Sequence, residues 1–144
     1  YEFNTVIIRP SAVYGPTDNN QRVIQKFIES IFEKKKIFAN NPKSNFLDFT
    51  YIKDIAEGIR LATLTDTSKI ETFNLTRGEG RSLFEVIEIL KDKLGNFDFE
   101  INQDDGIYPK RGSLDILRAK KLLNYEPKFS LEKGIEDYIS FLKN

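Results

Sequence analysis

The chain has 144 residues, 40% of them hydrophobic, which is enough for one moderate core and favours a single compact unit. Its 22 basic and 22 acidic residues cancel, so no whole-chain field attracts nucleic acid or an anionic membrane. Cysteine and histidine are absent, which excludes disulfides, thiolate or imidazole metal sites and a Ser-His-Asp triad within these residues. No apolar run approaches the roughly 20 residues that span a bilayer. We therefore expect a cytoplasmic protein that binds neither nucleic acid nor a membrane, and the lack of methionine suggests part of a longer chain.

The first third of the sequence predicts a strand, a connector and a helix. Residues 5–9 hold the continuous apolar run Val6-Ile7-Ile8, which is typical of a strand buried on both faces in a parallel sheet. Turn-forming residues fill 10–20, and apolar spacing over 23–32 predicts an amphipathic helix. Three lysines, 34–36, follow where the helix dipole favours cations, which is most simply a solvated helix end.

The middle of the chain predicts a strand that runs into a second helix. Over 46–51, apolar Leu47, Phe49 and Tyr51 alternate with polar Asp48 and Thr50, the pattern of a half-buried strand. The helix should cover 52–64, with Gly58 as a point of close packing. Its expected apolar face consists of Ile52, Ile55, Ala56, Ile59 and Ala62.

The last part predicts two strands and three helices. A strand at 72–76 leads to a helix that starts with the capping box Ser82 to Glu85 and ends at Gly95. A strand is expected at 97–101, and Ser113 and Ser130 are expected to cap the last two helices. The predicted apolar stripes are Leu114, Leu117, Leu122 and Leu123 for the first, and Leu131, Ile135, Tyr138, Ile139 and Leu142 for the second. Alternating strands and helices indicate an α/β fold with local α+β character.

Four segments in register resemble the extended short-chain dehydrogenase/reductases, the NAD-dependent epimerase/dehydratase family. They are Arg9-Pro10-Ser11-Ala12-Val13-Tyr14-Gly15-Pro16, the run from Leu47 to Ala56, Phe73-Asn74-Leu75 with the capped helix at Ser82, and Arg111 to Gly134. The resemblance implies that residues 1–144 form the carboxy-terminal, substrate-side part of a Rossmann-type enzyme, with its small substrate-binding subdomain. Strands at about 5–9 and 72–76 would belong to the Rossmann sheet, and the amino-terminal NAD-binding part would be absent.

The same resemblance implies which parts lie elsewhere. Family members bind NAD or NADP at a Gly-rich strand-to-helix turn and move protons with a Tyr-x-x-x-Lys pair. Neither motif occurs here, since none of the six tyrosines has a lysine four residues on. We therefore expect no catalytic residue in this chain and no activity from it alone. The parent would be a homodimer acting on a nucleotide-diphosphate sugar; the sugar, and the choice between epimerase, dehydratase and reductase, stay open.

The loop after the first strand carries the first candidate site residues. By resemblance, Pro10 and Ser11 lie beside the nicotinamide, although a rigid turn also explains the proline. Ala12 and Tyr14 belong to the substrate side of this loop. Many relatives carry at position 12 an asparagine that reaches the diphosphate, so that contact is lost here. Tyr14 also has a simpler interpretation, in which it shapes the loop together with Gly15.

The remaining candidates lie farther along the chain. Lys36 and Phe38 occupy the stretch that relatives lay against the nucleotide base, where Phe38 would stack on a pyrimidine or else be an ordinary core residue. Leu47 stands where relatives often place an arginine on the diphosphate. Arg111 is then the remaining candidate clamp, or a solvated loop residue, with Arg77 and Arg22 as lesser candidates.

Two acidic pairs suggest a catalytic or a metal-binding role but have simpler explanations. In the family, Asp48 and Asp54 mainly organise the strand-to-helix junction. Asp104-Asp105 has the ligand type for a metal, but adjacent loop carboxylates are usually only solvated. With Ala12 and Leu47 both departing from the family pattern, a non-catalytic nucleotide-binding or partner-binding module is the alternative function.

Overall fold

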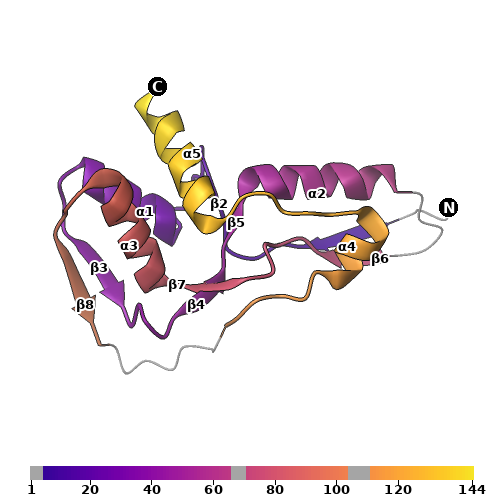
Figure 1. The fold of residues 1–144 in the computed structure, drawn as a ribbon, viewed down its shortest axis with the longest axis horizontal. Coiled ribbons are helices and arrows are strands. Elements are labelled where there is room, and N and C mark those ends of the chain that lie inside the picture. Colours follow the sequence, from indigo (N-terminus) through magenta and orange to yellow (C-terminus); the bar gives the residue numbers. More distant parts are fainter. Residues whose placement is uncertain (1–4, 66–70, 104–110) are drawn as a thin grey trace.

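The computed structural model describes residues 5–65, 71–103 and 111–144, and these form the expected α/β fold (Figure 1). The helices are α1 (Val23–Phe32), α2 (Ile52–Leu64), α3 (Leu83–Leu94), α4 (Leu117–Leu123) and α5 (Leu131–Lys143). The strands are β1 (Val6–Arg9), β2 (Val13–Tyr14), β3 (Ile37–Asn40), β4 (Phe46–Asp48), β5 (Thr50–Tyr51), β6 (Glu71–Asn74), β7 (Gly80–Ser82) and β8 (Phe99–Asn102).

The strands pair two by two within the described residues. The pairs β1–β6, β2–β5 and β3–β8 are parallel, and β4–β7 is antiparallel. In Figure 1, α2 and α4 accompany β1 and β6 at one end of the molecule, whereas α1 and α3 accompany β3 and β8 at the other. Helix α5 starts between these two ends.

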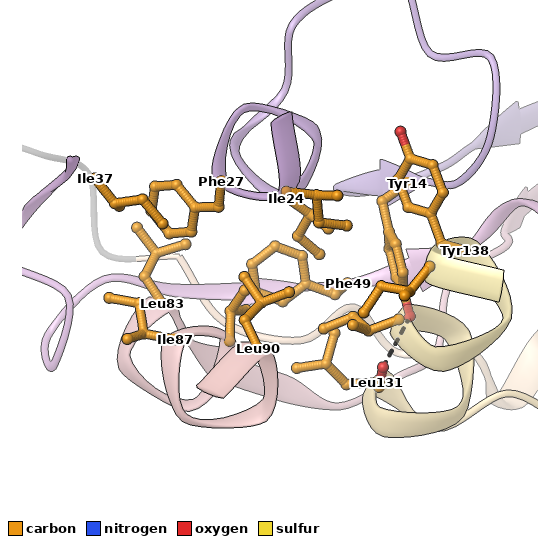
Figure 2. Close-up of a cluster of buried hydrophobic side chains, with 14 of the residues drawn as sticks. Tyr14, Ile24, Phe27, Ile37, Phe49, Leu83, Ile87, Leu90, Leu131 and Tyr138 are labelled. Atoms are coloured by element: carbon orange, nitrogen blue, oxygen red, sulfur yellow. Dashed lines mark hydrogen bonds between the residues drawn. The ribbon is translucent and has the colours of Figure 1, made fainter. Parts of the chain in front are cut away.

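Each end has its own hydrophobic core. The first core cluster joins α1, α3 and α5 to the strands between them, and ten of its side chains are labelled in Figure 2. Its fully enclosed members include Ile28, Val86, Ile87, Leu90 and Ile135. The second core cluster lies under α2 and consists of Ile55, Ala62, Phe73, Leu75, Ala119, Leu123 and Tyr125.

Four of the five predicted helices, α1, α2, α3 and α5, are confirmed in position. The bounds of α1 and α2 match the prediction, and the lysines at 34–36 follow the end of α1 as exposed residues. Ser82 and Glu85 form the reciprocal capping box of α3, which ends at Gly95 with a positive φ of 82°. Ser130 caps α5 by accepting a hydrogen bond from the backbone N–H of Lys133.

The expected solvated face of residues 46–51 is wrong. Asp48 and Thr50 have 0% exposed surface, because their oxygens accept hydrogen bonds from backbone N–H groups of a distant loop. Thr50 accepts from Arg77 at 2.9 Å and Asp48 from Gly78 at 3.1 Å. The segment also divides at Phe49, with β4 and β5 pairing to different partners.

Two predicted apolar faces are also wrong in part. The face of α2 that meets the second core cluster carries Ile55, Gly58 and Ala62, as predicted for Ile55 and Ala62. The other predicted members, Ile52, Ala56 and Ile59, are exposed. The expected close packing at Gly58 is confirmed, because a Cβ there would lie 2.8 Å from Leu75 Cδ1.

The start of α4 differs from the prediction as well. Ser113 does not cap it, because the helix begins at Leu117, whose N–H donates to the side chain of Asp115 at 2.8 Å. With this later start, the buried positions become Ile116, Ala119 and Leu123. The expected stripe residues Leu114, Leu117 and Leu122 are exposed instead.

Only one face of β1 is covered by described residues. Val6 and Ile8 pack against the second core cluster, whereas the side chain of Ile7 on the opposite face is 44% exposed, so burial on both faces stays a prediction. Among the described strands, β6 is its one pairing partner, in register from Val6↔Glu71 to Arg9↔Asn74.

This uncovered strand leads to a prediction about association. An exposed apolar strand with an unpaired edge is a template for pairing with another chain. The isolated 144-residue chain should therefore self-associate through β1 and β6, or leave them poorly protected. Light scattering combined with hydrogen exchange tests this. A monomer with strong amide protection from Val6 to Ile8 would contradict it.

Buried Asp54 provides a second prediction, about stability. Its carboxylate is 4% exposed and accepts hydrogen bonds from the N–H groups of Lys128 (2.8 Å) and Phe129 (3.0 Å). The substitution Asp54→Ala leaves both donors without an acceptor and should lower the free energy of unfolding by about 2–4 kcal/mol in urea titrations. The control Asp92→Ala removes an exposed carboxylate on α3 and should change it by less than about 0.5 kcal/mol. Equal effects of the two substitutions would show that the Asp54 contacts contribute little.

Candidate functional site

A pocket of about 690 Å³ opens beside the loop between β1 and α1. Its lining consists of residues 10–18, Asn20, Arg22, Val23, Ile24, Leu47, Phe49, Ile52 and Arg111. Three separate parts of the chain therefore form it: the loop with β2 and the start of α1, the β4-to-α2 junction, and the segment that contains Arg111. A volume of this size suits a small organic ligand.

The pocket loop has an unusual backbone. Ala12 and Thr17 have positive φ angles of 32° and 63°, which residues with a Cβ seldom adopt. Gly15 lies so close to α2 that a Cβ would be 2.4 Å from Ile52 Cγ2. Residues in such sparsely populated backbone conformations are concentrated at binding and active sites.

Both arginines of the lining are available for a ligand. Arg22, the N-cap residue of α1, donates through Nη1 to the carbonyl of Val13 at 2.9 Å and lies 3.9 Å from Asp18. Its guanidinium has five N–H donors, so this one bond leaves others to bind. Arg111 is exposed where it borders the pocket. Two guanidinium groups against one carboxylate, Asp18, favour an anionic ligand.

Tyr14 contributes to the wall but not through its hydroxyl. The side chain is 4% exposed, and its Oη donates to the carbonyl of Leu131 on α5 at 3.3 Å (Figure 2). Burial, with the neighbouring Tyr51 adding to it, raises the pKa of Tyr14 far above its usual value. The phenol therefore stays protonated at physiological pH and is unsuited to act as a base.

A second tyrosine, Tyr51, binds α5 from the segment between β5 and α2. The Oη of Tyr51 donates to Asp137 on α5 at 2.5 Å, and Lys53 Nζ lies 2.8 Å from that carboxylate. Hydrogen bonds from Lys53 and Tyr51 lower the pKa of Asp137. The carboxylate therefore stays ionised near neutral pH and keeps α5 against the start of α2.

The structure brings six of the eight predicted site residues to this pocket: Pro10, Ser11, Ala12, Tyr14, Leu47 and Arg111. Lys36 and Phe38 are not in its lining. Lys36 lies 3.2 Å from Glu100, and the side chain of Phe38 is 60% exposed on β3. The individual roles of all eight residues remain predictions.

Of the two lesser arginine candidates, one lines the pocket and the other does not. Arg22 lines the pocket, whereas Arg77 donates to the carbonyl of Pro127 and lies 3.7 Å from Glu79. Sequence reasoning did not single out Asp18, Asn20 or Ile52, which also line it. The turn-rich composition of 10–20 was the one available signal for the first two.

Other kinds of site find no support in the described parts of the chain. Residues 5–65, 71–103 and 111–144 contain no group of three or more acidic, histidine or cysteine side chains that could hold a metal ion. Asp104 and Asp105 lie outside the described residues. Among the described helices, none is long and apolar enough to cross a membrane.

Known proteins resemble the chain along nearly its whole length. It is 35% identical to a UDP-glucuronate 4-epimerase of Thermodesulfobacterium geofontis over 99% of the chain and 44% of that protein. It is 29% identical to UDP-glucuronic acid decarboxylase 1 of Arabidopsis thaliana over 96% of the chain and 32% of that protein. The chain therefore spans less than half the length of these curated relatives.

A solved structure extends the likeness to the fold. The crystal structure of UDP-glucuronic acid 4-epimerase from Bacillus cereus, in complex with UDP-glucuronic acid and NAD, superposes with a TM-score of 0.84 at 30% sequence identity. The match covers 96% of this chain and 45% of that one, so the α/β architecture corresponds to a portion of a Rossmann-type extended short-chain dehydrogenase/reductase. A family model also matches residues 1–76, a little over half of the chain. The chain thus belongs to the NAD dependent epimerase/dehydratase family.

Proposed function

We propose that this chain is the substrate-side portion of an NAD(P)-dependent enzyme that epimerises or dehydrates a nucleotide-diphosphate sugar, in the manner of UDP-glucose 4-epimerase. The observation that carries the proposal is the pocket, which joins Pro10 and Ser11 to two arginines within one cavity of about 690 Å³. Relatives named for UDP-glucuronate and complexes that contain UDP-glucuronic acid support a uridine nucleotide as the ligand.

The charges of the pocket suit a diphosphate. A planar guanidinium matches two phosphate oxygens at once, and Arg22 and Arg111 approach the cavity from different segments. Leu47 and Ala12 line the same cavity and supply no charge. In this proposal, Arg22 and Arg111 bind the diphosphate. They take the place of the polar residues that relatives carry at positions 12 and 47.

Pro10 and Ser11 form the end of the pocket that would border the nicotinamide. They directly follow β1, at the carboxyl end of a parallel strand, where α/β sheets bind their ligands. When bound, NAD or NADP supplies hydride acceptance and return at a sugar carbon. The chain itself has no Tyr-x-x-x-Lys pair and no Gly-rich turn, so we propose that it is inactive alone and that strands β1 and β6 belong to the sheet of a longer homodimeric parent.

A second candidate function is a nucleotide-binding or partner-binding module without redox turnover. Ala12 and Leu47 favour it, because each removes a polar diphosphate contact that relatives use. The sequence of the parent protein separates the two. A Gly-rich turn and a Tyr-x-x-x-Lys pair there would favour the enzyme, and their absence would favour the module.

The first test of this proposal concerns Arg111. Replacing it in the parent protein (Arg111→Ala) should weaken binding of the sugar nucleotide by about 1.5–3 kcal/mol, the contribution of a charged hydrogen bond, measured as a dissociation constant by calorimetry. A matched control is Arg60→Ala, which removes an exposed arginine of α2 that pairs with Glu57 outside the pocket. If Arg111→Ala left the dissociation constant unchanged, Arg111 would be a solvated loop residue.

The second test concerns the cofactor. The purified 144-residue chain should show no binding of NAD by calorimetry, because no Gly-rich turn is present to hold the pyrophosphate. UDP, titrated in the same instrument, should bind if the pocket takes the proposed ligand. Micromolar affinity for NAD would show that these residues suffice for the cofactor and would remove the argument that its main binding site lies elsewhere.

A further inference from the structure

Helix α5 packs tightly against Tyr14 and Tyr51 at a glycine. A Cβ built on Gly134 would lie 2.0 Å from Tyr14 Oη, 2.9 Å from Tyr14 Cζ and 3.1 Å from Tyr51 Cγ. Atoms do not approach so closely, so a side chain at residue 134 would require Tyr14 or α5 to shift. Glycine within a helix lowers helix stability by about 1 kcal/mol relative to alanine. A close packing contact is the reason that such a glycine would be required here.

The ring of Tyr14 has little room to move away. It packs edge-on against Phe49 with the ring centroids 6.4 Å apart, and against Tyr51 at 5.3 Å. Its hydroxyl donates to the carbonyl of Leu131, one turn before Gly134 on α5 (Figure 2). Because close-packed side chains pass strain to their neighbours, a push on this ring reaches the backbone that carries it.

That backbone is the wall of the pocket. Tyr14 belongs to β2, which pairs with β5 in the register Val13↔Thr50 and Tyr14↔Tyr51. The N–H of Thr50 donates to the carbonyl of Ala12 at 3.3 Å, and residues 10–18 line the cavity. The side chain of Tyr14 therefore connects α5 to the wall of the pocket.

We infer that Gly134 is a positioning residue for the pocket: by leaving space for the Tyr14 hydroxyl against α5, it fixes the wall formed by β2, although it does not line the cavity itself. A larger residue at 134 displaces Tyr14 and, through it, the segment from Ala12 to Gly15. The consequence for ligand binding rests on the proposed function, whereas the consequence for the wall does not.

The test compares Gly134→Ala with the double variant Gly134→Ala/Tyr14→Phe, in which the oxygen nearest the new Cβ is gone. In the 144-residue chain, Gly134→Ala should speed amide exchange at Thr50 by about tenfold or more, relative to the amides of Val86 and Ile87 in α3. It should also weaken UDP binding by about tenfold, since the wall no longer holds its contacts in place. The double variant should recover much of both losses.

A matched control is Gly58→Ala, the other buried helical glycine, whose new Cβ would lie 2.8 Å from Leu75 Cδ1 and 3.0 Å from Tyr125 Cε2 in the second core cluster. It should lower global stability while leaving the Thr50-to-α3 exchange ratio and the UDP dissociation constant unchanged. This separates positioning from a general loss of stability.

The possible outcomes are distinct. Unchanged exchange at Thr50 in Gly134→Ala, or no recovery in the double variant, overturns the inference. If Gly134→Ala fails to fold, folding of the double variant supports the contact and its failure to fold counts against it. If the unmodified chain does not bind UDP, the proposed ligand is wrong, and the exchange data still decide the role of Gly134.

Discussion

Two buried carboxylates hold the structure together at the junction between β4 and α2. Asp48 accepts hydrogen bonds from the N–H groups of Gly78 and Leu114, and Asp54 accepts from those of Lys128 and Phe129. A buried carboxylate is tolerated only when such donors surround it, so each aspartate fixes the segments that supply them. The loops before β7, α4 and α5 are thereby tied to one short stretch of chain. The family resemblance correctly assigned these aspartates to structure, although their partners lie far beyond the junction itself.

The same stretch separates the pocket from α5. Leu47, Phe49 and Ile52 line the pocket, while Tyr51 and Lys53 bind Asp137 on α5. The stretch divides at Phe49 between β4 and β5 and continues into α2 at Ile52, so its seven residues, 47–53, contact both the pocket and α5. This explains how the last helix influences the wall at Tyr14 without contributing to the pocket lining. It also explains why Asp54, within the following turn, supports the arrangement by holding the chain just before α5.

Sequence patterns predicted those parts of the fold that depend on near neighbours. The bounds of α1 and α2, the capping box at Ser82 and the cap at Ser130 involve residues only a few positions apart. The errors occur where a distant partner decides. Asp48 and Thr50 looked solvated because their donors lie about 30 residues away, at Arg77 and Gly78. The phase of α4 depends on Asp115 and on the second core cluster, which local spacing does not reveal. Six of the eight predicted site residues line one pocket. They were predicted from the family resemblance, which contains information on spatial neighbours that apolar periodicity lacks.

In the proposed diphosphate site, the positive charges come from Arg22 and Arg111, whereas position 47 on β4 is a leucine. An arginine at position 47 would extend from β4, whose backbone is paired with β7, whereas the side chain of Leu47 packs against the first core cluster. Arg111 is exposed, so a ligand must order its side chain at a cost of up to about 2 kcal/mol in conformational entropy. Arg22 is partly ordered already, since one of its donors binds the Val13 carbonyl. Of the two cations, Arg22 is therefore the better organised before binding, and the rigidity of the β2 wall that carries Val13 affects the charge of the pocket as well as its shape.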